Sequence, residues 1–129
     1  MKSVVSKDAP AAIGPYSQAI KVQGFVYTSG QNPLTPDGNM VEGTIQDQTR
    51  QILENLNAVL KEAGSSLDKV IKTTIYLTDM DNFFAVNSVY SEYFSQNYPA
   101  RSTVAVKKLP KDAQIEIDAI ALADSDVIF

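Results

Sequence analysis

Two charged side chains near the ends of predicted strands are the strongest candidates for chemistry in this sequence. Arg101 follows Pro99-Ala100 and comes directly before a strand, and its planar guanidinium can pair with a carboxylate through two hydrogen bonds. Glu116 lies within an apolar strand segment, where its carboxylate could orient a water molecule in a wet interface pocket. The alternatives are a surface ion pair for Arg101 and simple solvation for Glu116.

Four further candidates lie in turns or within a helix. Tyr16 follows Gly14-Pro15, and Ser29-Gly30 ends a strand at a glycine, which permits a ligand to approach the backbone closely. Asn87 lies in the middle of a predicted helix, where it either faces solvent or bonds to a loop backbone. Turn formation alone would also explain the two glycines, so none of these residues decides the function by itself.

The residue types that the chain lacks narrow the chemistry. It has no cysteine and no histidine, which excludes disulfides, thiolate nucleophiles, Ser-His-Asp triads and the usual zinc sites. Any proton transfer must therefore use carboxylate, tyrosine, lysine, backbone or water. The formal net charge is −4, from 11 basic and 15 acidic residues. Nucleic-acid binding depends on basic residues that neutralise phosphates, so an acidic chain disfavours it. We expect no metal and no nucleic-acid partner.

Length and composition indicate one small globular domain over residues 1–129, with 44% hydrophobic and 20% charged residues. A C-terminal tail at 124–129 could pack through Val127, Ile128 and Phe129. No apolar run approaches the ~18 residues of a membrane span, and the first 14 residues contain no apolar signal segment. We therefore expect a cytoplasmic protein with no membrane partner.

The elements that must position these residues are predicted in the order β-β-α-β-α-β-β, an α+β pattern. Strands are expected at 19–21, 25–29, 70–77, 102–107 and 114–122, and helices at 45–63 and about 82–96. A capping box of Thr44 and Asp47 opens the first helix, and Asp79 or Asp81 caps the second. The strand at 70–77 is expected to place one set of alternate residues on one face: Ile71, Thr73, Ile75 and Leu77.

Two helices can cover only one face of such a sheet. The last strand nevertheless has apolar residues on both faces, with Ile115 and Ile117 on one side and Ile120 and Leu122 on the other. In a domain of this size, partner subunits are the simplest cover for the second apolar face. We therefore expect an oligomer.

Six short stretches, in order along nearly the whole chain, resemble the RidA (YjgF) family of reactive-intermediate deaminases. They are 9–16 (APAAIGPY), 28–31 (TSGQ), 72–74 (KTT) with Asp79, 83–87 (FFAVN), 99–102 (PARS), and 109–111 (LPK) leading to 115–117 (IEI). The resemblance implies a chorismate-mutase-like fold with two helices on one face of a mixed sheet. It also implies a homotrimer whose sheets pack inward as a barrel, with active sites in the clefts between subunits and no cofactor.

The resemblance further implies hydrolysis of 2-iminopropanoate and 2-iminobutanoate to 2-keto acids and ammonia. On the matching positions, Arg101 would hold the substrate carboxylate and Glu116 would position or activate the attacking water. Supporting or pocket-lining roles would fall to Tyr16, Ser29, Gly30 and Asn87. Many members have cysteine at the position of Thr103, and we expect the contact there to use the backbone amide.

Two other functions remain open at this level. The same cleft could bind a 2-keto acid or a related metabolite and report it to a partner protein, which would make the chain a regulatory module. RNA cleavage, which has been attributed to relatives, is disfavoured by the net charge of −4 and by the absence of histidine.

Overall fold

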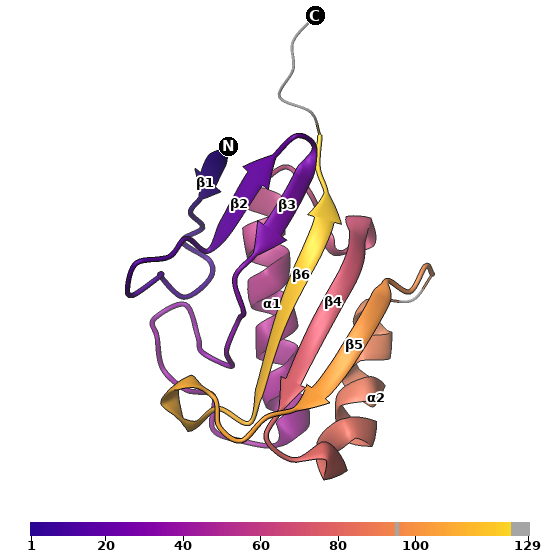
Figure 1. Cartoon of the computed structure of the whole chain (residues 1–129). Helices are drawn as coiled ribbons and strands as arrows, with labels where there is room; N and C mark the ends of the chain where they lie inside the picture. The colour runs from indigo at the N-terminus through magenta and orange to yellow at the C-terminus, as the bar shows by residue number, and fades with distance from the viewer. Residues whose placement is uncertain (95, 125–129) are drawn as a thin grey trace, which may run out of the picture.

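The computed structural model describes residues 1–94 and 96–124, so of the predicted tail only Asp124 lies within the described residues. Its elements confirm the α+β class (Figure 1). The strands are β1 Lys2–Val4, β2 Ala19–Val22, β3 Phe25–Thr28, β4 Val70–Leu77, β5 Ala100–Ala105 and β6 Ile115–Leu122. The helices are α1 Ile45–Glu62 and α2 Phe83–Tyr93, and the 3-10 turns are η1 Leu67–Lys69, η2 Met80–Asn82 and η3 Pro110–Asp112.

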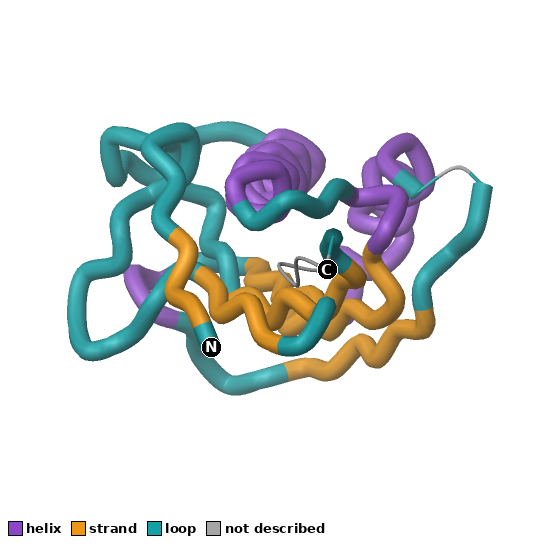
Figure 2. Tube along the Cα trace, turned by 90° about the horizontal axis from the view of Figure 1, so that it is seen from above, coloured by secondary structure: helices purple, strands orange, loops and turns teal. Residues whose placement is uncertain are grey.

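The six strands form one mixed sheet in the order β1-β2-β3-β6-β4-β5. Only β4 and β5 are parallel, and α2 is the crossover that joins them, as a parallel connection requires. Both helices lie on the same side of the sheet, and no helix among the described residues covers the other side (Figure 2). The predicted arrangement of two helices on one face of a mixed sheet is confirmed.

Beyond shifts of one residue at element ends, the structure differs from the predictions at β1, β5 and α2. The strand β1 was missed because three residues are too few to show an alternating pattern. The strand β5 begins at Ala100, so Arg101 lies within the strand instead of directly before it. The helix α2 ends at Tyr93 because Phe94 leaves helical geometry, with φ −121° and ψ 79°. Asp79 caps η2, accepting a hydrogen bond from the Asp81 amide, and η2 leads directly into α2.

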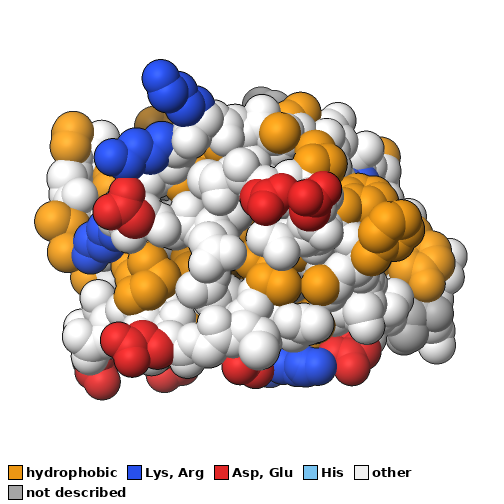
Figure 3. Space-filling view, turned by 90° about the horizontal axis from the view of Figure 1, so that it is seen from below, with side chains coloured by type: hydrophobic (Ala, Val, Ile, Leu, Met, Phe, Trp, Pro, Cys, Tyr) orange, Lys and Arg blue, Asp and Glu red, His pale blue; other side chains and the backbone are white. Residues whose placement is uncertain are grey.

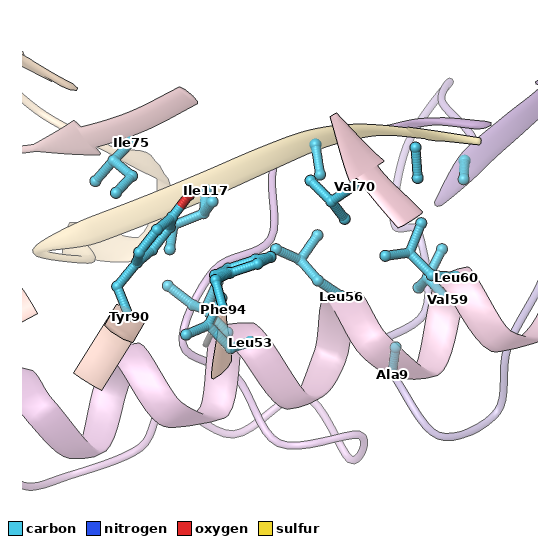
Figure 4. Packing of buried hydrophobic residues seen from close by; sticks show 14 of the residues in the cluster. Ala9, Leu53, Leu56, Val59, Leu60, Val70, Ile75, Tyr90, Phe94 and Ile117 are labelled. Carbon is cyan, nitrogen blue, oxygen red and sulfur yellow. The ribbon is translucent and has the colours of Figure 1, made fainter. Parts of the chain in front are cut away.

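The main helix α1 forms where the sequence predicts it. The Thr44 hydroxyl accepts a hydrogen bond from the Asp47 amide at 3.1 Å, and the Asp47 carboxylate accepts one from the Thr44 amide at 3.2 Å. Its apolar stripe is fully buried at Ile52, Leu53, Leu56, Val59 and Leu60. These side chains pack against the sheet together with Tyr90 and Phe94 from the region of α2 (Figure 4). The core therefore lies between the helix pair and one sheet face.

One predicted side-chain direction in β4 is wrong. Val70 pairs with Ala121 and Lys72 pairs with Ile120, so Ile71 has no partner in the ladder and forms a bulge. Val70 takes the buried position, and Ile71 is 42% exposed. From Thr73 onward the predicted alternation is confirmed.

The sheet face opposite the helices carries the second apolar surface that the sequence predicted. Tyr27, Val104 and Leu122 lie on it with 40% to 45% of each residue exposed. Polar groups lie among them, and the Tyr76 hydroxyl donates to the Asp118 carboxylate at 3.2 Å. We call this face the outer face. No helix among the described residues is long and apolar enough to cross a membrane.

Candidate active site

The structure separates the predicted site residues into two clusters. Four residues line a cavity of about 620 Å³ between the N-terminal segment and the loop after β3, and we call this cavity the Glu116 pocket: Tyr16, Ser29, Gly30 and Glu116. Two others line a second cavity of about 470 Å³ between α2 and β5, which we call the Arg101 cleft: Asn87 and Arg101. Thr103 lies two residues beyond Arg101 in β5 and lines neither cavity.

The two clusters lie on different sides of the sheet. Glu116 alternates with the buried Ile115 and Ile117, so its side chain is on the outer face. Arg101 bonds to Asn87 in α2, which places its side chain on the helix side. The strand β4 also separates β5 from β6. A single subunit therefore does not bring the predicted carboxylate anchor and the predicted general base together.

A break in the β3–β6 ladder creates the wall of the Glu116 pocket. The ladder ends at Tyr27 and Ile120, and it resumes as a bridge between Gln31 and Ile117. Between these points the β3 side has one residue more than the β6 side, so Thr28 to Gly30 bulge outward. The Thr28 hydroxyl replaces the lost backbone acceptor and accepts a hydrogen bond from the Ala119 amide at 2.9 Å.

Gly30 packs closely against Glu116. A Cβ atom built on Gly30 would lie 2.5 Å from the carboxyl carbon of Glu116, closer than real side chains approach. No hydrogen bond within the described residues engages the Gly30 amide. The pocket is thus lined by a glycine with an unengaged backbone amide, packed closely against a half-buried carboxylate.

Ser29 and Tyr16 occupy the rim of the same pocket. The Ser29 hydroxyl donates to the Ser17 carbonyl at 2.6 Å, which leaves its oxygen as an acceptor. Tyr16 is 53% exposed after a tight turn in which its amide donates to the Gly14 carbonyl at 2.9 Å. The segment at Gly14 therefore forms a tight turn, whereas Ser29 and Gly30 lie in the bulge, and Tyr16, Ser29 and Gly30 line the pocket.

Gln18 supports this pocket, and no sequence pattern identified it. Its side chain is 3% exposed and accepts a hydrogen bond from the Ser6 amide at 2.6 Å. It also donates to the Ser6 and Pro10 carbonyls at 3.2 and 2.7 Å. One buried amide side chain thus holds the irregular segment at 6–10 against β2. A glutamine just before a strand has no spacing that distinguishes it from a surface residue.

The surroundings of Glu116 on the outer face shift its pKa upward from the ordinary carboxyl value. Burial raises the pKa of Glu116, and the neighbouring Asp118 carboxylate raises it further. Burial also raises the pKa of Asp118, although hydrogen bonds from Tyr76 and Thr74 and the charge of Lys72 oppose that shift. Of the two carboxylates, Asp118 has the partners that stabilise its charged form, and Glu116 is the one suited to exchange a proton.

Arg101 is held by α2. Its Nη1 atom donates to Asn87 Oδ1 at 2.8 Å. Asn87 therefore bonds to a side chain, whereas the sequence predicted that it would face solvent or bond to a loop backbone. The Arg101 Cζ atom lies 5.0 Å from the Tyr90 ring centroid and 5.5 Å from that of Phe83. No carboxylate among the described residues forms an ion pair with Arg101. Its remaining N–H donors are available to a ligand.

Thr103 contributes a buried hydroxyl whose oxygen has no hydrogen-bond partner among the described residues. The backbone contact expected for this position stays a prediction. The described residues also contain no group of three or more acidic side chains that could hold a metal ion.

Comparison with known proteins places this arrangement in a family. The family model described as Endoribonuclease L-PSP matches residues 6–123. A RutC family protein of Pyrococcus horikoshii is 54% identical over 94% of this chain and 98% of its own length. AldR of Lactococcus lactis, whose name describes a candidate regulator, is 49% identical over 94% of this chain and 97% of its own.

A crystal structure of YyfA from Yersinia pestis, described as a protein of unknown function of the conserved Rid family, has the same fold. It is 51% identical, with a TM-score of 0.92, and the match covers 95% of this chain and 98% of that one. The chain therefore belongs to the L-PSP family, which is the YjgF/RidA family that the sequence resembles.

Proposed function

We propose that this protein hydrolyses reactive 2-imino acids, such as 2-iminopropanoate and 2-iminobutanoate, to 2-keto acids and ammonia. The active site would be assembled between neighbouring subunits of a homotrimer, from the Arg101 cleft of one and the Glu116 pocket of the next. One observation carries this proposal: Arg101 and Glu116 lie on different sides of the sheet of one subunit. Two copies are needed to bring an anchor and a base to one substrate.

The residues suit this reaction. Arg101 has free donors in a fixed plane, which fits bidentate binding of the substrate carboxylate. Glu116, when ionised, would take a proton from water as the water oxygen bonds to the iminium carbon, giving a neutral carbinolamine. Glu116 then returns the proton to the carbinolamine nitrogen and the C–N bond breaks to release ammonia. As the ketone forms, the Glu116 carboxylate takes the hydroxyl proton and passes it to the ammonia. Iminium plus water thus gives keto acid plus ammonium.

Little further catalytic power is needed, because an iminium carbon is already electrophilic. Positioning and one oriented water supply the remaining acceleration. The unengaged Gly30 amide would lie beside the reacting centre as a neutral donor. The proposed mechanism requires no histidine, cysteine, metal or cofactor.

The test generates 2-aminoacrylate or 2-aminocrotonate in situ with a serine/threonine dehydratase and follows the appearance of 2-keto acid. Wild-type protein should accelerate it. Arg101→Ala should lower kcat/KM by about 10- to 100-fold, because hydrogen bonds to charged groups contribute about 1.5–3 kcal/mol. The matched control is Arg50→Ala, since Arg50 is the only other arginine and pairs with the exposed Glu92 at 3.2 Å. Equal rates for both variants would contradict the proposal.

The second candidate is a regulatory module that binds 2-keto acids, and the name of the Lactococcus lactis relative favours it. Tight binding of 2-oxobutanoate by wild-type protein without acceleration of imine hydrolysis would support this candidate. The family description names an endoribonuclease. On the side of the molecule shown in Figure 3, lysine and arginine side chains form no continuous track, and acidic side chains lie among them. That surface is unsuited to a phosphate backbone. A cytoplasmic location stays part of the proposal.

A further inference from the structure

We infer that Tyr90, together with Phe83, forms an aromatic seat that positions the Arg101 guanidinium, and that Tyr90 is a positioning residue of the candidate site. The kinetic consequence of this inference rests on the proposed function. The geometric part does not, and it can be tested in the absence of substrate.

The seat is built on one stripe of α2. Phe83, Asn87 and Tyr90 are spaced four and three residues apart, so their side chains leave the helix on the same side. The Arg101 Cζ atom lies 5.0 Å from the Tyr90 ring centroid and 5.5 Å from that of Phe83, both within the ~6 Å range of a cation–π contact. Asn87 fixes one edge of the guanidinium at 2.8 Å. Two rings and one amide therefore restrain its position and its rotation.

Tyr90 is itself held rigidly. It is 4% exposed, and its hydroxyl lies 2.8 Å from the Thr73 hydroxyl in β4. Its ring packs against Phe94 with centroids 4.5 Å apart. Figure 4 shows the side chain pointing from α2 toward the sheet. Thr73 is also the β4 residue directly paired with Arg101, so one strand pair carries both the arginine and the anchor of its seat.

Fixing the Arg101 guanidinium before a ligand arrives should strengthen carboxylate binding in the cleft and set the orientation of the ligand. An arginine side chain loses considerable rotamer freedom when it is immobilised by a ligand, and that loss weakens binding. Here the loss occurs on folding, before any carboxylate arrives. The plane of the guanidinium then sets the plane of a bidentate carboxylate, which orients the rest of the ligand.

The direct test is the ¹⁵N–¹H spectrum of the arginine side chains. The chain has two arginines, so two Nε–Hε signals are expected, and Arg101→Lys assigns them. A guanidinium stacked on aromatic faces has its protons shifted upfield, so the Arg101 signal should lie upfield of that of the exposed Arg50. Tyr90→Leu should remove that upfield shift. Phe94→Leu removes a buried ring that packs on Tyr90 but makes no cation–π contact with Arg101, so it should reduce the shift far less than Tyr90→Leu does.

Two further variants separate the seat from general core damage. Tyr90→Phe keeps the ring and loses only the hydrogen bond to Thr73, so the Arg101 shift should survive. Phe83→Leu should reduce the shift without threatening the core, because Phe83 is only partly buried. Phe84→Leu is its matched control, since Phe84 is adjacent on the same helix and 82% exposed. An unchanged Arg101 signal in folded Tyr90→Leu and Phe83→Leu proteins would overturn the inference.

The kinetic readout is a split between KM and kcat. Tyr90→Leu should raise KM for the imine, and Kd for 2-oxobutanoate, by about 3- to 30-fold, equivalent to about 0.7–2 kcal/mol, with kcat changed far less. Tyr90→Phe should restore both constants. If the wild-type protein did not hydrolyse the imine, only the proposed function would be refuted. The spectra and the Kd for 2-oxobutanoate would still test whether the aromatic seat positions Arg101. Equal losses in Tyr90→Leu and Phe94→Leu would reduce Tyr90 to a core residue.

Discussion

At the scale of single residues, Glu116 and Gly30 form a unit in which each explains the other. The carboxyl group lies over the glycine so closely that a side chain fits there only if the carboxyl group moves. The sequence marked both residues as candidates but could not show that they touch, because they are 86 positions apart and pair across a ladder break. The same limit applied to Arg101 and Asn87, whose hydrogen bond depends on how α2 lies against β5.

Gly30→Ala is expected to damage the site more than the fold. The added Cβ would lie 2.5 Å from the carboxyl carbon of Glu116, so the carboxyl group must move away. The flexible end of a glutamate can move, so we expect a stability loss of about 1 kcal/mol or less. Imine hydrolysis should fall at least tenfold. Gly24→Ala is the control for activity, since Gly24 does not line the pocket and a Cβ there would approach only the Ala123 carbonyl oxygen, at 4.0 Å, although its φ of 82° makes that variant strained. Wild-type turnover in Gly30→Ala would contradict the geometry.

Glu116→Gln should stabilise the protein at neutral pH while it abolishes activity. The folded-state pKa of Glu116 is raised by burial and by Asp118, so the folded protein binds a proton more readily than the unfolded chain. Wild-type stability therefore falls as pH rises from the ordinary carboxyl pKa through the raised one, and stays reduced above it. Glutamine does not ionise and avoids that loss.

This sign is checked by urea denaturation of wild type and Glu116→Gln at acidic and neutral pH. The stability gain of the variant should be present at neutral pH and vanish at acidic pH, where wild-type Glu116 is protonated. Glu62→Gln is the control, since Glu62 is an exposed residue at the end of α1. A gain that is independent of pH would point to packing instead of ionisation.

At the scale of elements, helix capping and the periodicity of apolar residues predicted the features that depend only on local sequence. The capping box and the apolar stripe determine α1, and the alternation of β6 determines both of its faces. The bulge at Ile71 could not be predicted, because the register of β4 is set by its neighbour β6 and not by its own residues. The role of Gln18 could not be predicted either, because it depends on contacts outside its own segment. Its side chain donates to carbonyl groups of the irregular segment at 6–10.

Thr44→Ala tests how much of the fold depends on the start of α1. The variant removes the hydroxyl that accepts from the Asp47 amide, and such caps contribute about 1 kcal/mol, within a range of about 0.5–2. Urea denaturation at fixed protein concentration should show this loss without a change in m-value. Ser91→Ala, at an exposed position within α2, should change stability by no more than about 0.5 kcal/mol. Equal effects would mean that the cap does not stabilise α1.

At the scale of the whole molecule, the outer face and the divided site have a common explanation. A sheet with one bare, partly apolar face needs a cover, and two half-sites on different sides of that sheet need a neighbour. A closed ring of subunits would satisfy both needs at once, because each copy offers its Arg101 cleft to one neighbour and its Glu116 pocket to the other. Assembly and activity should therefore be lost together.

Tyr27→Asp tests this coupling. Tyr27 is 45% exposed on the outer face, directly opposite Ile120 in the β3–β6 ladder. A charge at this position would be buried without a partner when subunits assemble, and an unpaired buried charge costs several kcal/mol. Light scattering should show wild type as a trimer and the variant as a smaller species, with imine hydrolysis lost although neither half-site is mutated. Asn57→Asp introduces the same charge on α1, on the helix side, and should leave both properties intact. An active monomer would contradict the shared site, because within one subunit Arg101 and Glu116 remain on different sides of the sheet.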